Sequence, residues 1–104
     1  MTLAEAAARA DELASAGDEK ALATLRQQWD EELEHAARSS DYRVRAQAYR
    51  AIAQFRFRQK LELVRRGLED ESPAARGSAL IALEALSRDH PGDVNSMRAL
   101  LHEL

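Results

Sequence analysis

Three features of the sequence predict an all-α fold made of repeated helical hairpins. Strong helix formers dominate and helix breakers are rare, because the 104 residues include 21 alanines and 13 arginines but only 4 glycines and 2 prolines. Apolar residues recur at spacings of three and four along most of the chain, which is the period of a helix that buries one face. Two stretches also match each other at a constant offset of 31 residues. A chain of this length is typical of one domain with a modest core.

Six helices are predicted, and most of their boundaries carry a capping or breaking residue. Ala16-Gly17 ends the first helix, and Asp18 and Asp41 are suitable N-caps for the second and third. Ser72 followed by Pro73 is typical of a helix start, with proline in the first helical position. The predicted helices span roughly residues 3–15, 19–37, 42–55, 59–69, 73–87 and 94–104.

Two of these helices have faces with a distinct composition. The third helix has an apolar face and an opposite, polar stripe at spacings of four, three and four, formed by Arg43, Gln47, Arg50 and Gln54. The sixth helix has a dense apolar stripe at the chain terminus, formed by Met97, Leu100, Leu101 and Leu104. One hairpin buries only part of such a stripe, so it predicts self-association through an end or a face of the fold.

The stretch "AQFRFRQKLELVRR", residues 53–66, alternates phenylalanine with arginine before a basic run. The alternation could indicate a strand, but no neighbouring segment is suited to pair with it. We therefore predict a bend between two helices. In this interpretation Phe55 closes the third helix as a core residue, and the ring of Phe57 packs back on the hairpin.

The internal repeat matches equivalent positions of the third and fifth helices. Residues 42–55 align with residues 73–86, and the aligned pairs at the offset of 31 are Arg45 with Arg76, Ala48 with Ala79, Ala51 with Ala82, Ile52 with Leu83, and Phe55 with Leu86. After the turn, Leu61, Val64 and Leu68 align with Val94, Met97 and Leu101 at an offset of 33. A repeat of thirty-odd residues built from two helices is typical of a solenoid.

The stretch "DESPAARGSALIALEAL" resembles the HEAT-repeat family, especially its short bacterial branch related to phycobilin lyase subunits. That branch reads Asp-x-x-Pro-x-Val-Arg-x-x-Ala-x-x-Ala-Leu, and the matching residues here are Asp70, Pro73, Arg76, Ala79, Ala82 and Leu83. Ala75 replaces the usual valine. The earlier copy matches through Val44, Arg45, Ala48, Ala51 and Ile52, but Tyr42 replaces the proline and Ser39 the aspartate. The resemblance covers about residues 39–104.

The resemblance implies a small right-handed α-solenoid of three antiparallel helical hairpins, at about residues 3–37, 41–70 and 72–104, in a single HEAT-like domain. It also implies a structural ladder in which Arg45 and Arg76 pair with acidic residues of the loops between repeats. Asp41 and Asp70 are the candidates for those acidic partners.

A basic block lies between two acidic regions. Residues 41–66 contain eight basic and two acidic side chains, although the whole chain has a net charge of −3. One interpretation is a surface that binds anions, nucleic acid or an acidic partner. Its candidate residues are Arg43, Arg50, Arg56, Arg58, Lys60, Arg65 and Arg66. The other interpretation is internal pairing, in which Lys60, Arg65 and Arg66 meet the acidic second helix (Asp30, Glu31, Glu32 and Glu34) and Glu62 pairs with Arg66.

Composition and motifs give no support for catalysis. The chain has no cysteine, which excludes disulfides, thiolate zinc sites and a thiol nucleophile, and fits a reducing compartment. His102-Glu103 resembles a ligand pair of HEAT-type di-iron hydroxylases, and Glu31 and His35 are four residues apart, but those enzymes need several facing pairs. We therefore expect no catalytic residue, no metal and no cofactor.

The function expected from the sequence is a non-enzymatic protein-interaction or scaffold module that uses the face of the second, fourth and sixth helices. A homo-oligomer is one form that such a module could take. The partner would be a protein. Binding of nucleic acid or of a phosphorylated ligand through the basic block is the alternative, and the family resemblance adds a lyase-accessory role. The first residues lack the pattern of a secretory signal, and no apolar run approaches the ~18 residues of a membrane span, so we expect a cytoplasmic protein without membrane contact.

Overall fold

The computed structural model describes residues 1–89, and within this range the secondary structure is entirely helical. The all-α prediction is therefore confirmed. The helices are α1 (Leu3–Ala16), α2 (Glu19–Ala37), α3 (Tyr42–Gln54), the 3-10 helix η1 (Arg58–Lys60), α4 (Leu61–Gly67) and α5 (Pro73–Asp89). The predicted sixth helix, its apolar stripe and the His102-Glu103 pair lie outside the described residues, as does most of the second half of the predicted third hairpin.

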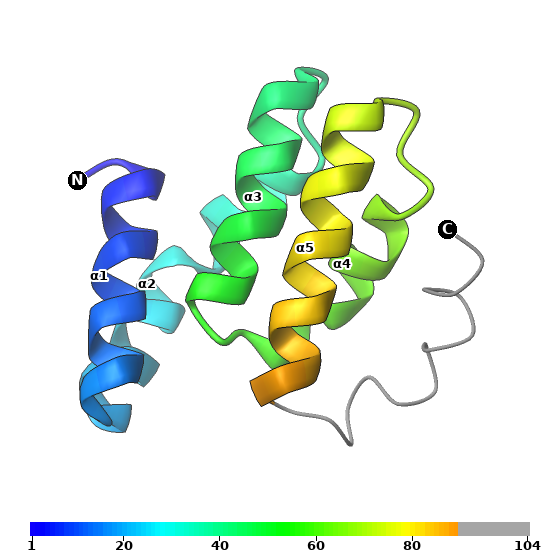
Figure 1. Ribbon diagram of the computed structural model, residues 1–104. Coiled ribbons are helices and arrows are strands. Elements are labelled where there is room, and N and C mark those ends of the chain that lie inside the picture. Colours follow the sequence, from blue (N-terminus) through cyan, green and yellow to red (C-terminus); the bar gives the residue numbers. More distant parts are fainter. Residues whose placement is uncertain (90–104) are drawn as a thin grey trace.

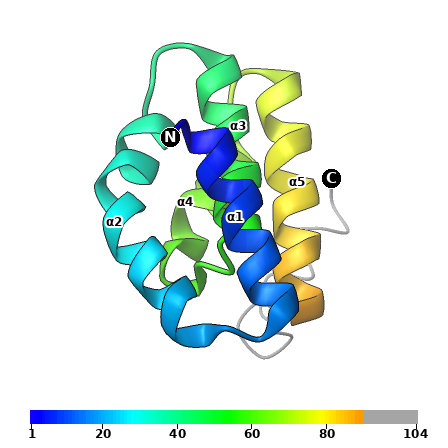
Figure 2. The same cartoon turned by 90° about the vertical axis from the view of Figure 1, so that its left-hand side faces the viewer.

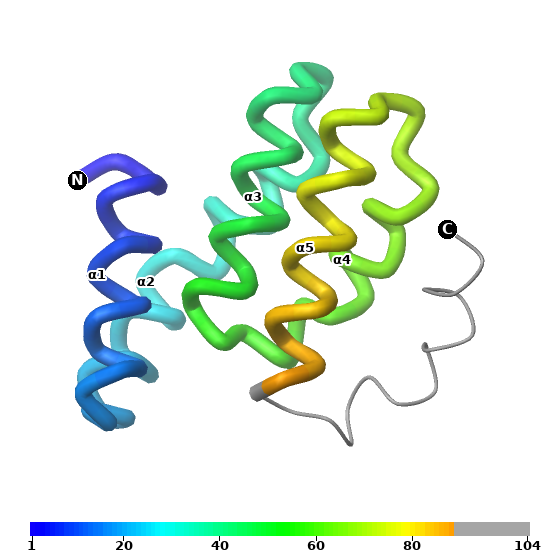
Figure 3. Tube along the Cα trace, in the orientation of Figure 1, coloured from blue at the N-terminus to red at the C-terminus, as the bar shows by residue number. Residues whose placement is uncertain are grey.

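The helices form two layers. In Figure 1, α1, α3 and α5 stand side by side in front, and α2 and α4 lie behind them. The view from the side shows the same separation (Figure 2). The tube in Figure 3 shows that α3 and α5 run in the same direction, as equivalent helices of consecutive repeats do. These stacked helical pairs form a small α-solenoid.

Caps define the helix ends, and the predicted caps are present. The side chains of Asp18 and Asp41 accept hydrogen bonds from the backbone at the starts of α2 and α3. Gly17 ends α1 in the left-handed conformation, with φ of 74°. The structure adds a cap that the sequence analysis missed: the Thr2 hydroxyl and the Glu5 carboxylate form a reciprocal capping box at the start of α1.

The core between α3 and α5 consists largely of small side chains. The repeat-related pairs Ala48 with Ala79 and Ala51 with Ala82 are all almost completely buried. Larger side chains fill the space toward the second layer, and those fully buried are Phe55, Leu22, Leu33, Ile52, Leu83, Leu86 and Val64. Alanine lets two helices approach closely, so the α3–α5 contact is the most extensive between helices in the described chain.

The stretch of alternating phenylalanine and arginine is the end of α3 and a turn, so the bend prediction is confirmed. The N–H of Phe57 bonds to the carbonyl of Ile52, and the N–H of Arg56 bonds to that of Ala53. These two bonds form a Schellman motif, in which a glycine usually occupies the left-handed position. Here that residue is Arg56, with φ of 53°. Phe55 and Phe57 are both buried, as expected for core residues.

The predicted fourth helix, 59–69, is shorter than expected. A 3-10 turn over Arg58–Lys60 precedes it, and α4 covers only Leu61–Gly67. No side chain caps its N-terminus. The buried side chains of Phe57 and Lys60 instead hold the entering chain against the core, and a tighter 3-10 turn suits that constraint.

Gly67 and Gly77 are a matched pair for testing how tightly α4 packs. A Cβ at Gly67 would lie 2.7 Å from the Cβ of Ala79 and 2.8 Å from the ring of Tyr49, whereas a Cβ at Gly77 on α5 would meet nothing within 4 Å. We expect Gly67→Ala to lower the free energy of unfolding by about 1–3 kcal/mol, because the helices must separate.

Gly77→Ala is the control, and we expect it to raise the free energy of unfolding by about 0.5–1 kcal/mol through helix propensity. Urea denaturation of both variants measures the difference. Equal stability of the two variants would contradict the close approach of α4 to α5.

Candidate functional site

The basic residues of the central block do not form one surface, because most of them are paired with carboxylates from different parts of the chain. Arg43 contacts Asp41, Arg56 contacts Asp11, Lys60 contacts Asp30 and Glu34, and Arg65 contacts Glu62. Glu62 therefore pairs with Arg65, three residues on, and not with Arg66 as the sequence analysis expected. The geometry favours internal pairing over a continuous anion-binding surface.

The best-defined polar cluster joins α3 to the loop before α5. The Arg45 guanidinium donates two hydrogen bonds to Asp70, at 2.8 and 2.9 Å, and the Tyr49 hydroxyl donates a third at 3.1 Å. Both charged side chains are largely buried, at 14% and 6% exposure. Asp41 and Asp70 were the two candidate partners of Arg45, and the structure shows that Asp70 is the partner. Asp41 instead caps α3 and contacts Arg43.

Asp70 also organises the start of α5. Its carboxylate accepts a hydrogen bond from the Ser72 N–H, and its carbonyl accepts one from the Arg76 guanidinium at 2.7 Å. The bidentate bond from Arg45, with help from Ser72 and Tyr49, lowers the pKa of Asp70 from its ordinary 3.8 to about 2. Burial, together with the bond to Asp70, raises the pKa of Tyr49. The ladder residues therefore hold one repeat to the next.

Lys60 is a buried charged residue that joins the first and second hairpins. Its side chain is 5% exposed, and its ammonium lies 2.5 Å from Asp30 and 3.0 Å from Glu34 of α2. It also lies 4.9 Å from the centre of the Phe57 ring. The expectation that Arg65 and Arg66 meet the acidic face of α2 is wrong for Arg65, which contacts Glu62, and among the described residues no ion pair is recorded for Arg66. For Lys60, in the 3-10 turn before α4, the same expectation agrees with the structure, since it contacts Asp30 and Glu34 of α2.

Two further contacts tie the turn after α3 to the first hairpin. The Arg56 guanidinium donates to Asp11 of α1 at 2.9 Å and to the carbonyl of Gln54. Arg26 of α2 donates to the carbonyl of Phe55 at 2.8 Å. No sequence signal indicated either contact, since the partners are 45 and 29 residues apart. The strained conformation of Arg56 is thus offset by bonds that a glycine could not make.

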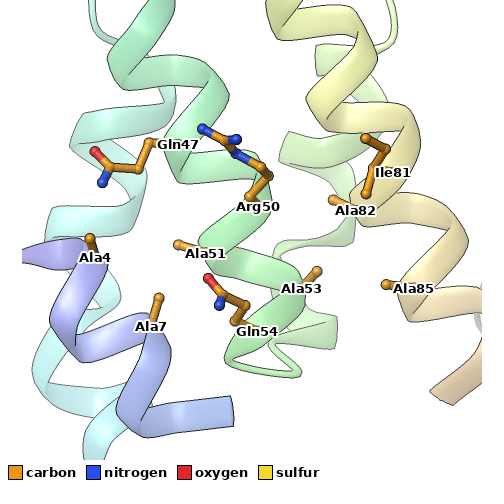
Figure 4. Close-up of a pocket in the computed structure, with 10 residues that line it drawn as sticks. All are labelled: Ala4, Ala7, Gln47, Arg50, Ala51, Ala53, Gln54, Ile81, Ala82 and Ala85. Carbon is orange, nitrogen blue, oxygen red and sulfur yellow. The ribbon is translucent and has the colours of Figure 1, made fainter.

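A shallow hollow of about 500 Å³ lies across the front layer of helices. Figure 4 shows its lining: Ala4 and Ala7 of α1, the polar residues Gln47, Arg50 and Gln54 of α3, and Ile81 and Ala85 of α5, with Ala51, Ala53 and Ala82 between them. Ile81 is 62% exposed, a large fraction for a bulky apolar side chain. A second hollow of about 320 Å³ shares Ala53, Gln54 and Ala85 with the first. We call the two together the front groove.

The remaining candidate sites are few. Within residues 1–89, no three histidine, aspartate or glutamate side chains are grouped so that they could hold a metal ion. Glu31 and His35 line a hollow with Leu3, Val44 and neighbouring residues, and both are exposed. In the same part of the chain, none of the helices combines the length and the apolar character that crossing a bilayer requires.

The fold and the ladder define the class of this protein: an α-solenoid whose helical hairpins are joined by an arginine–aspartate contact between repeats. The family model for HEAT repeats matches residues 31–103, from the second half of α2 onward. The chain therefore belongs to the HEAT-repeat family. Searches of curated proteins and of solved structures gave no match.

The acid stability of the fold depends on Asp70. Because its pKa is lower in the folded than in the unfolded chain, Asp70 stabilises the fold above about pH 4, and this contribution is lost as the pH falls from 3.8 toward 2. We expect the loss to be about 2 kcal/mol, visible as a falling urea midpoint, and Asp70→Asn to remove this part of the pH dependence.

Asp18→Asn is the control for Asp70→Asn, since asparagine caps a helix as well as aspartate does. Asp70 and its donors are unchanged in this variant, so its stability should still fall between pH 4 and 2. If Asp70→Asn also kept the parent profile, the ladder would not be the origin of the acid sensitivity.

Charge reversal separates the buried contact of Lys60 from the exposed contact of Arg65. We expect Lys60→Glu to lower the free energy of unfolding by about 3 kcal/mol or more, because it places a carboxylate in a buried position facing Asp30 and Glu34. Arg65→Glu should lower it by less than about 1 kcal/mol, because its contact with Glu62 is exposed.

Lys60→Met is the control for burial. Methionine keeps most of the apolar stem, and the two carboxylates remain accessible to water, so we expect a loss of only about 1 kcal/mol. Urea denaturation at low and high salt measures all three variants. A loss for Lys60→Glu no larger than that for Arg65→Glu would contradict the role assigned to Lys60.

Proposed function

We propose that this chain is a non-enzymatic protein-interaction module that binds a protein partner along the front groove. HEAT repeats commonly mediate protein–protein interactions, and family membership gives that general expectation. The observation that carries the proposal is Ile81, a 62% exposed isoleucine in a hollow whose floor is made of alanines. An exposed apolar side chain in a concave surface is typical of a binding site.

The chemistry of the front groove supports binding rather than catalysis. Its polar groups are amides and guanidinium groups, with Asp11 held by Arg56. Amides and guanidinium groups donate hydrogen bonds, and guanidinium stays protonated at any physiological pH. Neither acts as a general base, and the one carboxylate among the lining residues, Asp11, is held in an ion pair with Arg56, so the groove is better suited to recognition than to proton transfer.

The front groove differs from the surface that the sequence analysis favoured. The sequence suggested the face of the second, fourth and sixth helices. In the described chain, however, the exposed large apolar residues are Met1, Tyr42 and Ile81, and none of them lies on α2 or α4. The outer surface of α2 carries exposed charged residues such as Glu31 and Glu32. The α1–α3–α5 face is therefore the better candidate.

A photo-crosslinking residue in place of Ile81 tests the proposal. In lysate of the source cells, we expect a discrete adduct that protease destroys and nuclease leaves intact. Excess unmodified protein should compete with its formation, and excess Ile81→Glu protein should not, because a buried carboxylate in the interface opposes binding.

The same crosslinker in place of Gln28, an exposed residue of α2, is the matched control and should give no such adduct. An adduct formed equally from both positions would contradict the proposal, as would an adduct removed by nuclease. An adduct with the mass of two copies of this chain would show that the partner is a second copy of the chain and not another protein.

A further inference from the structure

The outward positions of α3 and α5 are equivalent in the repeat but differ in chemistry. At the offset of 31, the polar residues Gln47, Arg50 and Gln54 of α3 correspond to Ser78, Ile81 and Ala85 of α5. The two helices run side by side in the same direction (Figure 3). In Figure 4, Arg50 lies level with Ile81, and Gln54 lies level with Ala85. The front groove therefore has a polar ridge along α3 and a largely apolar wall along α5.

Between these two sides and α1, the floor is made of alanines, which leave room for the side chains of a partner. The hollow continues toward the C-terminal ends of α3 and α5, where Asp11, Arg56 and Arg88 line it. An extended surface of this shape, set along the direction of the helices, suits a helix of a partner that lies in the groove. Since α3 has 13 residues, a partner helix that lies along its whole length is about 20 Å long.

The free charges of the front groove are positive. Arg50 and Arg88 are exposed, and no ion pair is recorded for either within residues 1–89. The remaining charged residues of the groove, Arg56 and Asp11, are paired with each other. Because the whole chain has a net charge of −3, this positive charge is local. Guanidinium groups bind carboxylates in a bidentate manner, so the groove is complementary to an acidic partner.

The spacing of the two free arginines limits the pattern of acidic residues. Ile81 lies level with Arg50, and Arg88 is seven residues beyond Ile81 on α5. Seven residues of an α-helix rise about 10 Å. Residues i and i+7 of a partner helix are also about 10 Å apart and lie on nearly the same face. Two carboxylates with that spacing match the separation of the two arginines along the axes of α3 and α5.

We infer that the partner segment is an amphipathic α-helix with a stripe of small apolar residues and with two carboxylates two turns apart. This inference rests on the function proposed above. The apolar stripe packs against Ile81 and the alanine floor, and the carboxylates bind Arg50 and Arg88.

A synthetic helical peptide of 16 residues tests the inference. It carries alanine and leucine on one face, with glutamates at positions i and i+7 beside them. Titration into the ¹⁵N-labelled full chain, followed by NMR, should shift the backbone signals of α3 and α5 around Arg50 and Ile81. The double variant Arg50→Gln with Arg88→Gln should bind about tenfold more weakly.

The titration has two controls: a peptide with the same composition as the first, and a protein variant that loses an arginine outside the groove. A peptide with the second glutamate moved to i+9, on the opposite face, should bind about as weakly as the double variant does. Arg66→Gln removes an exposed arginine of α4, outside the groove, and should bind the first peptide as the parent protein does.

Several results would overturn the inference. These are equal affinity for both peptides, no shifts on the α1–α3–α5 face, and equal weakening by Arg66→Gln. Tighter binding of a DNA oligonucleotide that the double variant abolishes would identify a phosphate polyanion as the occupant. Shifts that grow with the concentration of the chain alone would identify a second copy. Crosslinking at position 81 can succeed while the two peptides bind with the same affinity. In that case the proposed interaction function stands and the acidic-helix inference fails.

Discussion

The contact between Arg45 and Asp70 sets the register of the two consecutive repeats. Asp70 receives Arg45 and Tyr49 from α3 on its carboxylate, and Arg76 from α5 on its carbonyl. One loop residue thus places the start of α5 relative to α3. The equal heights of Arg50 and Ile81, and with them the form of the front groove, follow from that register. Because the carboxylate is almost fully buried, the hydrogen bonds that it accepts from Arg45, Tyr49 and the Ser72 N–H compensate for its burial.

The front groove is a consequence of packing by small side chains. Ala48, Ala51, Ala79 and Ala82 let α3 and α5 approach closely, and Gly67 lets α4 reach the same region. Alanine, however, does little to fill space beyond the helix backbone, so the outer side of the same layer remains hollow. Of these residues, Ala51 and Ala82 also line the hollow, and a larger residue there would fill it only by separating the repeats. Repeat cohesion and the shape of the groove therefore depend on the same residues.

Much of the fold could be predicted from the sequence because its signals are local. The caps at Asp18 and Asp41, the bend at Phe55 and the repeat offset need only neighbouring residues or a comparison of the chain with itself. The ion pairs were predicted only in part: Arg45 with Asp70 and Lys60 with α2 were expected, and the partners of Arg65 and Arg56 were not. A 3-10 turn of three residues changes which side of the next helix faces α2, so Lys60 reaches it and Arg65 does not. The Asp11–Arg56 contact joins residues 45 apart and has no sequence signature. The front groove could not be predicted because three helices form it. One signal was present in the sequence, since an exposed repeat position is Arg50 in one copy and Ile81 in the other.

The distribution of arginine connects stability to recognition in this chain. Arg26, Arg45 and Arg56 each join segments far apart in the sequence, through carboxylates or backbone carbonyls. Lys60 does the same from a buried position. Positive charge used in this way is neutralised or enclosed and contributes little to the field at the surface. Among the residues that line the front groove, the charge that remains is that of Arg50 and Arg88. Two positive charges on a net acidic chain would not attract polyanions in general. Their fixed separation can nevertheless distinguish one arrangement of carboxylates from another.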